Sequence, residues 1–289
     1  YYLDKSVSTA LDIPDTLGGH PVVAIGNNAF TSCTNLPAVT IPSGVRNIGR
    51  NAFGLCGALT TVTIPNTVTN IEELAFTLCS SLTDVTLPEG VATIGRCAFA
   101  KCLALPSINI PGTVAFIDEW AFVSCYALTS ITVAGNNQHY ASSDGVLFNK
   151  SLTTLVMCPS GYSGAYAIPA DVTTIANSAF TSCTSLTSVA IHHGVTFIGA
   201  SVFEHCDSLT SIDVNPNNQH YASKDGVLFN KNRTTLIQYP NGLHGAYTIP
   251  DGVTTIGADA FRLSIFLTAV TIPASVTTIG DGAFSECPL

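Results

Sequence analysis

Charge is scarce in this sequence. Lys, Arg, Asp and Glu make up only 10% of the 289 residues, and the ten Lys and Arg residues never stand next to one another. Phosphate binding needs clustered cations, so the composition argues against a nucleic-acid partner. With 46% hydrophobic residues and a net charge of −9, we expect a folded chain whose surface is covered mostly by Thr, Ser, Asn and Gly.

Long apolar runs are also lacking. No uninterrupted apolar stretch reaches the roughly 18 residues that a transmembrane helix needs, so we predict no membrane span in this chain. The sequence opens at Tyr1-Tyr2-Leu3-Asp4 without a signal-like segment. We expect that an export signal preceded it and was removed.

Catalytic motifs are not found either. The sequence contains no Gly-rich phosphate loop, no paired-carboxylate motif and no nucleophile elbow. His139 and His220 are each followed five residues later by a carboxylate, Asp144 and Asp225. A metal or acid–base role for these pairs stands beside the simpler interpretation of a loop hydrogen bond. We predict that the protein is not an enzyme, binds no metal and needs no cofactor.

A 23-residue repeat dominates what is present. Phenylalanine occurs at positions 30, 53, 76, 99 and 122, and again at 180, 203, 261 and 284, across two gaps of 58 residues. The unit is clearest between Thr61 and Leu82 and reads L-x-x-V-x-I-P-x-x-V-x-x-I-x-x-x-A-F-x-x-C. No single unit could bury its apolar side alone, so the units must stack on one another.

Each unit is predicted to contain three short elements. Val62 and Ile64 alternate with Thr61 and Thr63, as in a strand with one buried face, and the following proline ends that strand. Residues 68–71 are β-branched and predict a short second strand, while residues 72–78 have helical composition and predict a short helical turn. The expected fold class is an α/β repeat.

Eight of the ten cysteines follow a repeat phenylalanine by three residues. A cysteine at one phase of every turn predicts a column of buried free thiols, and Ser264 fills the same slot. The spacing of about 4.8 Å between adjacent parallel strands would also permit disulfides. Cys97 and Cys158 lie outside this column.

Two longer segments interrupt the repeat. Residues 136–168 and 217–249 are near-copies of each other at an offset of 81 residues. In each, a Gly-Val-Leu-Phe arm, a polar turn and a Thr-Thr-Leu-Val/Ile arm predict a β-hairpin, or else the second arm takes a regular strand position. We predict a single solenoid over residues 1–289, with residues 1–22 as an atypical N-terminal cap.

The repeat pattern resembles the BspA-like class of leucine-rich repeat. One turn carries it in Leu36, Val39, Ile41, Pro42, Val45, Ile48, Ala52, Phe53 and Cys56. The resemblance implies a right-handed solenoid with a parallel β-sheet on the concave side, and with short second strands and helical turns on the convex side. It also implies export to the cell surface and adhesion to host extracellular-matrix proteins or to surface proteins of other cells.

Two sets of surface positions are candidate binding residues. The first is the outward-facing row of the first strands, a flat and mostly hydroxyl-bearing face; its members are Thr61, Thr63, Asp84, Thr86, Ser107, Asn109, Ser130 and Thr132. The second set is Phe116, Trp120 and Phe197, which stand where other turns have polar residues. Solvation of a strand face and packing under a neighbouring loop would explain the two sets without any binding.

These observations lead us to expect a secreted or surface-attached module that binds a protein or glycoprotein and acts as a monomer. A structural spacer that projects another domain from the cell is the alternative. A metal-dependent or carbohydrate-processing enzyme is the third hypothesis, and it would need a site between His139 and Asp144.

Overall fold

The computed structural model describes residues 8–288, which form 28 short strands and no helix. Contacts group the chain into two compact units, and each is described by itself. Unit 1 runs to Ser151 and includes Pro159–Gly161, and unit 2 comprises Leu152–Cys158 and Tyr162–Leu289. The first seven residues of the predicted 1–22 cap lie outside the described residues. A single solenoid, its right-handed coil and its concave sheet stay predictions.

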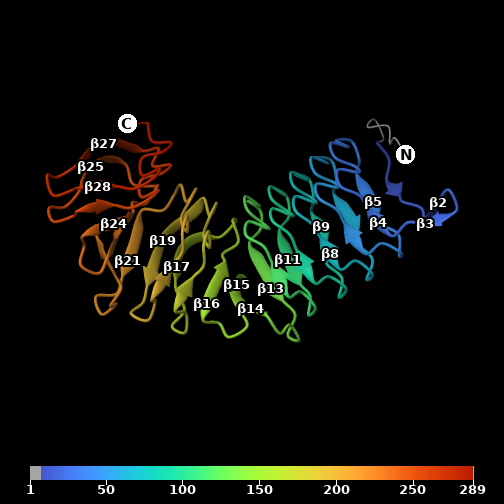
Figure 1. The fold of residues 1–289 in the computed structure, drawn as a ribbon, viewed down its shortest axis with the longest axis horizontal. Helices are drawn as coiled ribbons and strands as arrows, with labels where there is room; N and C mark the ends of the chain where they lie inside the picture. The colour runs from blue at the N-terminus through green and yellow to red at the C-terminus, as the bar shows by residue number, and fades with distance from the viewer. Residues whose placement is uncertain (1–7, 289) are drawn as a thin grey trace. The chain divides into compact units, whose positions relative to one another are not determined.

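In unit 1 the strands form two series of parallel sheets (Figure 1). The first series contains β1 (Leu11–Asp12), β5 (Ala38–Thr40), β7 (Thr61–Thr63) and β9 (Asp84–Val85), then β11 (Ser107–Ile110) and β13 (Ser130–Val133). The second contains β4 (Ala24–Ile25), β6 (Asn47–Ile48), β8 (Asn70–Ile71), β10 (Thr93–Ile94) and β12 (Phe116–Ile117). A small hairpin of β2 (Thr16–Leu17) and β3 (His20–Pro21) precedes β4. Both strands predicted for each repeat are therefore confirmed.

Unit 2 repeats the arrangement. Its first series contains β17 (Ser163–Ala167), β19 (Ser185–Ile191) and β21 (Ser211–Val214), then β25 (Gly245–Thr248) and β27 (Leu267–Thr271). Its second series contains β16 (Thr154–Met157), β18 (Thr174–Ile175) and β20 (Phe197–Ile198), then β24 (Thr235–Gln238), β26 (Thr255–Ile256) and β28 (Thr278–Ile279).

The core is a set of columns in which equivalent residues of successive turns touch. Rings of the repeat phenylalanines from Phe30 to Phe122 stack with centroids 5.0–5.5 Å apart and interplanar angles of 3–10°. Phe180 and Phe203 stack in the same way at 5.5 Å in unit 2. Because offset stacking adds to the burial of each ring, the phenylalanine column contributes both core area and register.

The predicted helical turns are wrong, and the hydrogen bonds show why. In one turn the amides of Asn51, Phe53 and Leu55 donate to carbonyl groups of the next turn at 2.8–2.9 Å. The amides between them donate to the carbonyl three residues earlier. Each turn of unit 1 has a pair of residues with positive φ four positions apart, such as Leu74 (62°) and Leu78 (59°) in the segment expected to be helical. A left-handed residue stops a helix, and here it turns every second amide toward the neighbouring turn.

Seven of the eight cysteines in the column are buried thiols outside any disulfide, as predicted, and the eighth, Cys287, is half-buried. The thiols of Cys56 and Cys79 donate to the carbonyl groups of Phe30 and Phe53, each at 3.2 Å. Burial raises the pKa of Cys56 to about 12, so this thiol stays protonated and unreactive at neutral pH. Cys158 departs from expectation: it packs against the column, with its carbonyl 3.8 Å from the Cys183 sulfur.

Each interrupting segment begins with an antiparallel hairpin. In unit 1 this is β14 (Tyr140–Ser143) with β15 (Val146–Asn149), and in unit 2 it is β22 (Tyr221–Lys224) with β23 (Val227–Asn230). The Asp144-Gly145 turn has φ angles of 50° and 78°, as a type I′ turn requires. In unit 2, β23 also pairs antiparallel with β24, which pairs parallel with β26. The predicted hairpin therefore forms there, and its second arm also takes a regular second-series position.

A buried asparagine fastens each hairpin to the preceding turn. Asn137 is fully buried; its amide nitrogen donates to the carbonyls of Pro111 (2.8 Å) and Val114 (2.9 Å). Its oxygen accepts from the amides of His139 and Tyr140, both at 2.8 Å. Asn218 makes the same four bonds in unit 2. All four hydrogen-bonding positions of this buried side chain are used, so the Asn-Asn-Gln-His-Tyr stretch has a structural role.

Replacing Phe76 by alanine tests the stacked column. Its ring is fully buried between Phe53 and Phe99, at 5.3 and 5.2 Å. We expect F76A to lower the free energy of unfolding of unit 1 by about 3–5 kcal/mol in urea titrations. The control T63A removes an exposed hydroxyl side chain and should change it by less than about 0.5 kcal/mol. A loss for F76A no larger than that of T63A would contradict the account.

Candidate binding surface

The predicted hydroxyl-bearing face lies in unit 1 and is divided between two sheets. Seven of its members are exposed, and Ser130 is half-buried. Those exposed are Thr61, Thr63, Asp84, Thr86, Ser107, Asn109 and Thr132. The face carries no large side chain, and within it Thr132 donates to the Asn109 side chain at 3.0 Å. A partner could make polar contacts across this flat face, but the face has no large side chain to anchor it.

Ser130 is half-buried because the inserted hairpin closes this edge of the face. The amide of Ile131 donates to the carbonyl of Gly145 at 2.8 Å, and the amide of Val133 donates to the Ser142 hydroxyl at 3.0 Å. A Cβ atom on Gly145 would lie 3.1 Å from the Ser130 Cα. The hairpin therefore ends the first series in unit 1 and removes Ser130 from the free surface.

Two of the three predicted aromatic residues are well exposed. Phe116 is 52% exposed and Phe197 is 53% exposed. Each lies on the last strand of a second-series sheet, where the following amide, of Ile117 or Ile198, donates to a hairpin tyrosine hydroxyl at 3.0 Å. The two phenylalanines thus hold equivalent positions, in units 1 and 2, next to an inserted hairpin.

Trp120 is half-buried and lies in the turn after β12, at a left-handed position with φ of 61°. Equivalent residues such as Asn51 (53°) and Leu74 (62°) share this conformation, so the fold imposes it and it does not single out Trp120. The guanidinium carbon of Arg96 lies 4.4 Å from the centroid of the Trp120 ring. This cation–π contact holds both side chains in one place.

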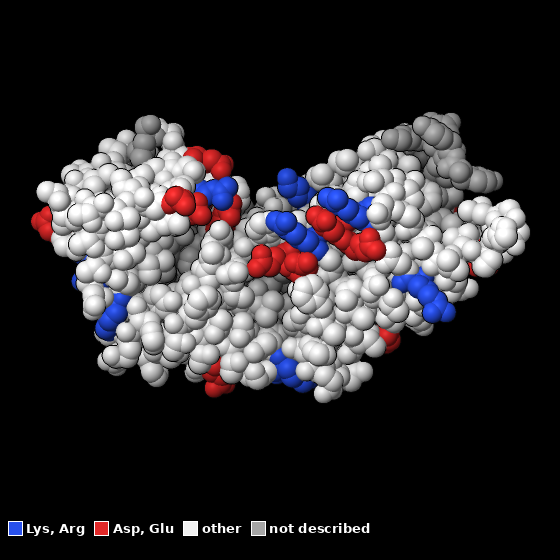
Figure 2. Space-filling view, viewed as in Figure 1, with Lys and Arg blue, Asp and Glu red and all other residues white. Residues whose placement is uncertain are grey.

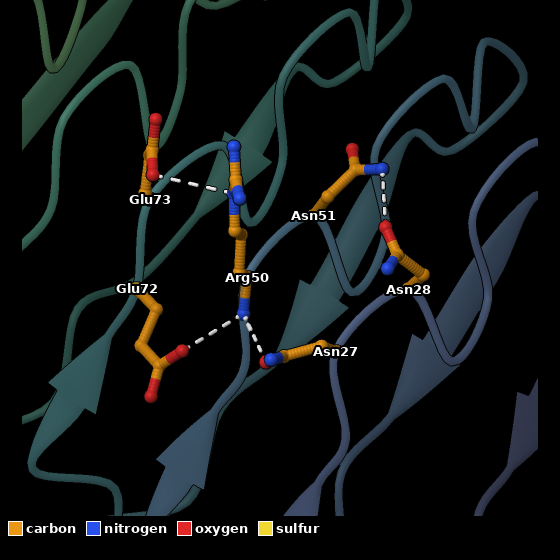
Figure 3. Close-up of polar contacts among 6 residues, drawn as sticks. All are labelled: Asn27, Asn28, Arg50, Asn51, Glu72 and Glu73. Atoms are coloured by element: carbon orange, nitrogen blue, oxygen red, sulfur yellow. Dashed lines mark hydrogen bonds and ion pairs between the residues drawn. The ribbon is translucent and has the colours of Figure 1, made fainter.

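A column of charged residues, which the sequence analysis missed, lies beside these aromatics. Arg50, Glu73 and Arg96 stand 23 residues apart and alternate in sign. The Arg50 Nε lies 3.2 Å from the Glu73 Oε2 (Figure 3), an exposed ion pair that contributes at most about 1 kcal/mol. Figure 2 shows positive and negative side chains gathered in a patch over the turns of this unit. Writing the sequence in rows of 23 would have revealed the column.

Glu72, next to this column, is fixed by two hydrogen bonds. The Asn47 amide nitrogen donates to its Oε1 at 2.7 Å, and the Arg50 backbone amide donates to its Oε2 at 3.0 Å. Figure 3 shows the Arg50 amide reaching both Glu72 and the side-chain oxygen of Asn27, the latter at 2.9 Å. The half-buried carboxylate of Glu72 is therefore held in position before any ligand arrives.

These side chains surround an open groove of about 600 Å³ in unit 1. Its floor lies over β8, β10 and β12, and its walls come from the charged turns. The lining includes Asn70, Glu72, Thr93, Arg96, Phe116 and Asp118. An exposed aromatic ring, guanidinium groups, carboxylates and an amide thus meet in one depression, which makes it our candidate binding site.

A second ion cluster, in unit 2, is less suited to binding. Arg262 contacts the carboxylates of Glu204 at 2.9 Å and Glu286 at 3.0 Å. The hydrogen bond to Glu286 is the main cause of a raised pKa for Arg262. Because two carboxylates already engage this guanidinium, the cluster stabilises unit 2 internally.

The His139–Asp144 pair is not brought together. His139 precedes strand β14, and Asp144 follows it in the hairpin turn. Four extended residues between them separate the two by roughly 15 Å. Among the described residues no group of three or more His, Cys, Asp and Glu side chains could hold a metal ion. The hypothesis of a metal site here therefore has no geometric support.

The stacked parallel turns define a leucine-rich-repeat β-solenoid. Residues 8–129, 165–247 and 245–289 match the model of the BspA type leucine rich repeat region in six copies, and the chain belongs to this family. A comparison with curated proteins found no match. Within the described residues no helix is long and apolar enough to span a bilayer.

Solved structures of bacterial proteins have similar folds. A leucine-rich repeat protein from Eubacterium ventriosum is 23% identical with a TM-score of 0.70, over 99% of this chain and 84% of that one. A leucine rich cell surface protein from Faecalibacterium prausnitzii is 30% identical with a TM-score of 0.62, over 97% and 85%. The pneumococcal vaccine antigen PcpA is 19% identical with a TM-score of 0.63, over 100% and 80%, and this likeness concerns the fold alone.

The contact between Arg96 and the sole tryptophan gives a direct test of the site geometry. Removing the guanidinium in R96A should expose the Trp120 ring to water and shift its fluorescence emission to longer wavelength. R50A is the matched control, since the Arg50 side chain pairs with Glu73. Equal spectra for R96A, R50A and the parent protein would show that the stacking does not exist in solution.

Proposed function

We propose that this chain is a non-catalytic binding module of a cell-surface or secreted protein, and that it adheres to a protein or glycoprotein partner. The observation that carries the proposal is the groove of unit 1, which Phe116 and Arg96 line, with the Trp120 ring in contact with Arg96. Aromatic residues and arginine are the types that most often anchor protein interfaces. The partner would be a host extracellular-matrix protein or a surface protein of another cell.

Two further observations support this role. The 30% identical protein from Faecalibacterium prausnitzii is a cell surface protein. The repeated positions of each unit form the core, so residues at surface positions can differ from turn to turn. Repeat proteins acquire their binding surfaces at such positions. The exposed hydroxyl-bearing face around Thr61 and Thr63 would contribute peripheral contacts that need no anchor.

The experiment is a binding assay of the 289-residue protein against purified extracellular-matrix proteins and intact cells. We expect W120A and F116A each to weaken binding by about tenfold or more, because F116A removes an exposed ring that lines the groove and W120A removes the ring that holds Arg96 in place. T63A, on the flat face, should change binding less than twofold. Folding of each variant is checked by its urea midpoint.

Two results would refute the proposal. The first is no binding to any matrix protein or cell, which would favour a structural spacer. The second is binding that T63A weakens as much as W120A does, which would move the site to the flat face.

A further inference from the structure

The groove of unit 1 presents hydrogen-bond donors and acceptors together beside a bare aromatic ring. We propose that it is a subsite for a neutral oligosaccharide. This inference rests on the proposed binding role of the same surface, and it names the chemistry recognised there: sugar hydroxyl groups and the apolar face of a pyranose ring.

Phe116 supplies the apolar platform. Its ring is 52% exposed at one end of the groove. Strand pairing places Phe116 beside Thr93 and Thr93 beside Asn70, so an aromatic ring, a hydroxyl and an amide form one row across β12, β10 and β8. A phenylalanine ring cannot hydrogen-bond through a polar tip, so it favours a flat C–H surface such as one face of a sugar ring.

The donors of the groove come from Asn70 and Arg96. The Thr93 hydroxyl donates to the Asn70 Oδ1 at 2.9 Å, which leaves the amide nitrogen of Asn70 as its donor. Arg96 lies over the Trp120 ring, with its guanidinium carbon 4.4 Å from the ring centroid, and the five N–H groups of its guanidinium are donors.

Glu72 and Asp118 are the acceptors. Both Glu72 oxygens are already positioned by Asn47 and by the Arg50 amide. The Asp118 Oδ1 accepts from the Glu119 amide at 2.6 Å. Each carboxylate oxygen has two lone pairs, so a ligand hydroxyl can bind without displacing these internal bonds.

This mixture of groups discriminates between ligand classes. A hydroxyl both donates and accepts, so it can use every polar group of the groove. An ammonium group could use the acceptors of the groove but none of its amide and guanidinium donors, and a sulfate could use those donors but none of the carboxylates. The two guanidinium groups in the lining nearly balance the three carboxylates, so the groove exerts little net attraction on a charged ligand.

Phe197 provides the matched control. It occupies the equivalent slot in unit 2, with the same exposure as Phe116, and Thr174 is its strand neighbour. The slots that hold Arg96 and Asp118 near Phe116 hold Asn177 and Gly199 near Phe197. If exposed apolar area alone were responsible for binding, replacing either phenylalanine would weaken it equally. If the groove is a sugar site, only the replacement of Phe116 weakens binding.

The test is a titration of the 289-residue protein with neutral tetrasaccharides of glucose, galactose, mannose and N-acetylglucosamine. Binding is followed by Trp120 fluorescence and by saturation-transfer NMR from protein to sugar. An open groove without deep burial predicts a Kd on the order of 1 mM for at least one of them. F116A should weaken it about tenfold or more, and F197A should leave it within about twofold. Tetralysine and inorganic sulfate should not bind at the same concentrations.

Three outcomes would overturn the inference: no tetrasaccharide binds, F116A and F197A have equal effects, or tetralysine binds more tightly than every sugar. The failure of the proposed function is distinguishable. Capture of a matrix protein by a chain that binds none of the tetrasaccharides would leave the protein-binding role standing and remove the sugar subsite. Sugar binding without capture of any matrix protein or cell would do the reverse.

Discussion

Everything in this structure depends on the bond between one turn and the next. Amides such as those of Asn51, Phe53 and Leu55 donate to carbonyl groups of the following turn, and the phenylalanine rings stack in step with them. These hydrogen bonds between turns set the register in which the turns stack, and the phenylalanine column supplies buried apolar area. The thiol column follows the same rule, because six of its eight cysteine sulfurs bond to the carbonyl of a phenylalanine in the preceding turn.

This constraint also decides where function can be located. Residues that make the hydrogen bonds between turns or lie in the core columns hold successive turns together. A substitution there therefore affects the stability of the whole unit. Outward positions are free to differ from turn to turn, and the stacking of the turns sets equivalent residues of neighbouring turns side by side. Arg50 and Glu73 therefore meet at 3.2 Å although 23 residues separate them. The same rule brings Asn70, Thr93 and Phe116 into one row and so builds the groove.

The sequence predicted the periodic part well, because strands and core columns repeat in every turn. The prediction was wrong for residues 72–78. Their composition is helical, yet Leu74 and Leu78 adopt positive φ and the amides bond between turns. The outer hairpin strand β14 was missed, although its Asp-Gly turn signals one. At the site, Phe116 and Trp120 were found as exceptions to the pattern. The charged column was missed because its members become neighbours only through register.

The most direct test of this account is hydrogen exchange of single amides in unit 1. The amides of Phe53 and Phe76 donate to the next turn at 2.8 and 2.7 Å. If these bonds hold the unit together, both amides should exchange only through its cooperative unfolding, with the same free energy as measured in urea. Exchange of Phe53 and Phe76 through small local openings, at a free energy well below that value, would contradict the account.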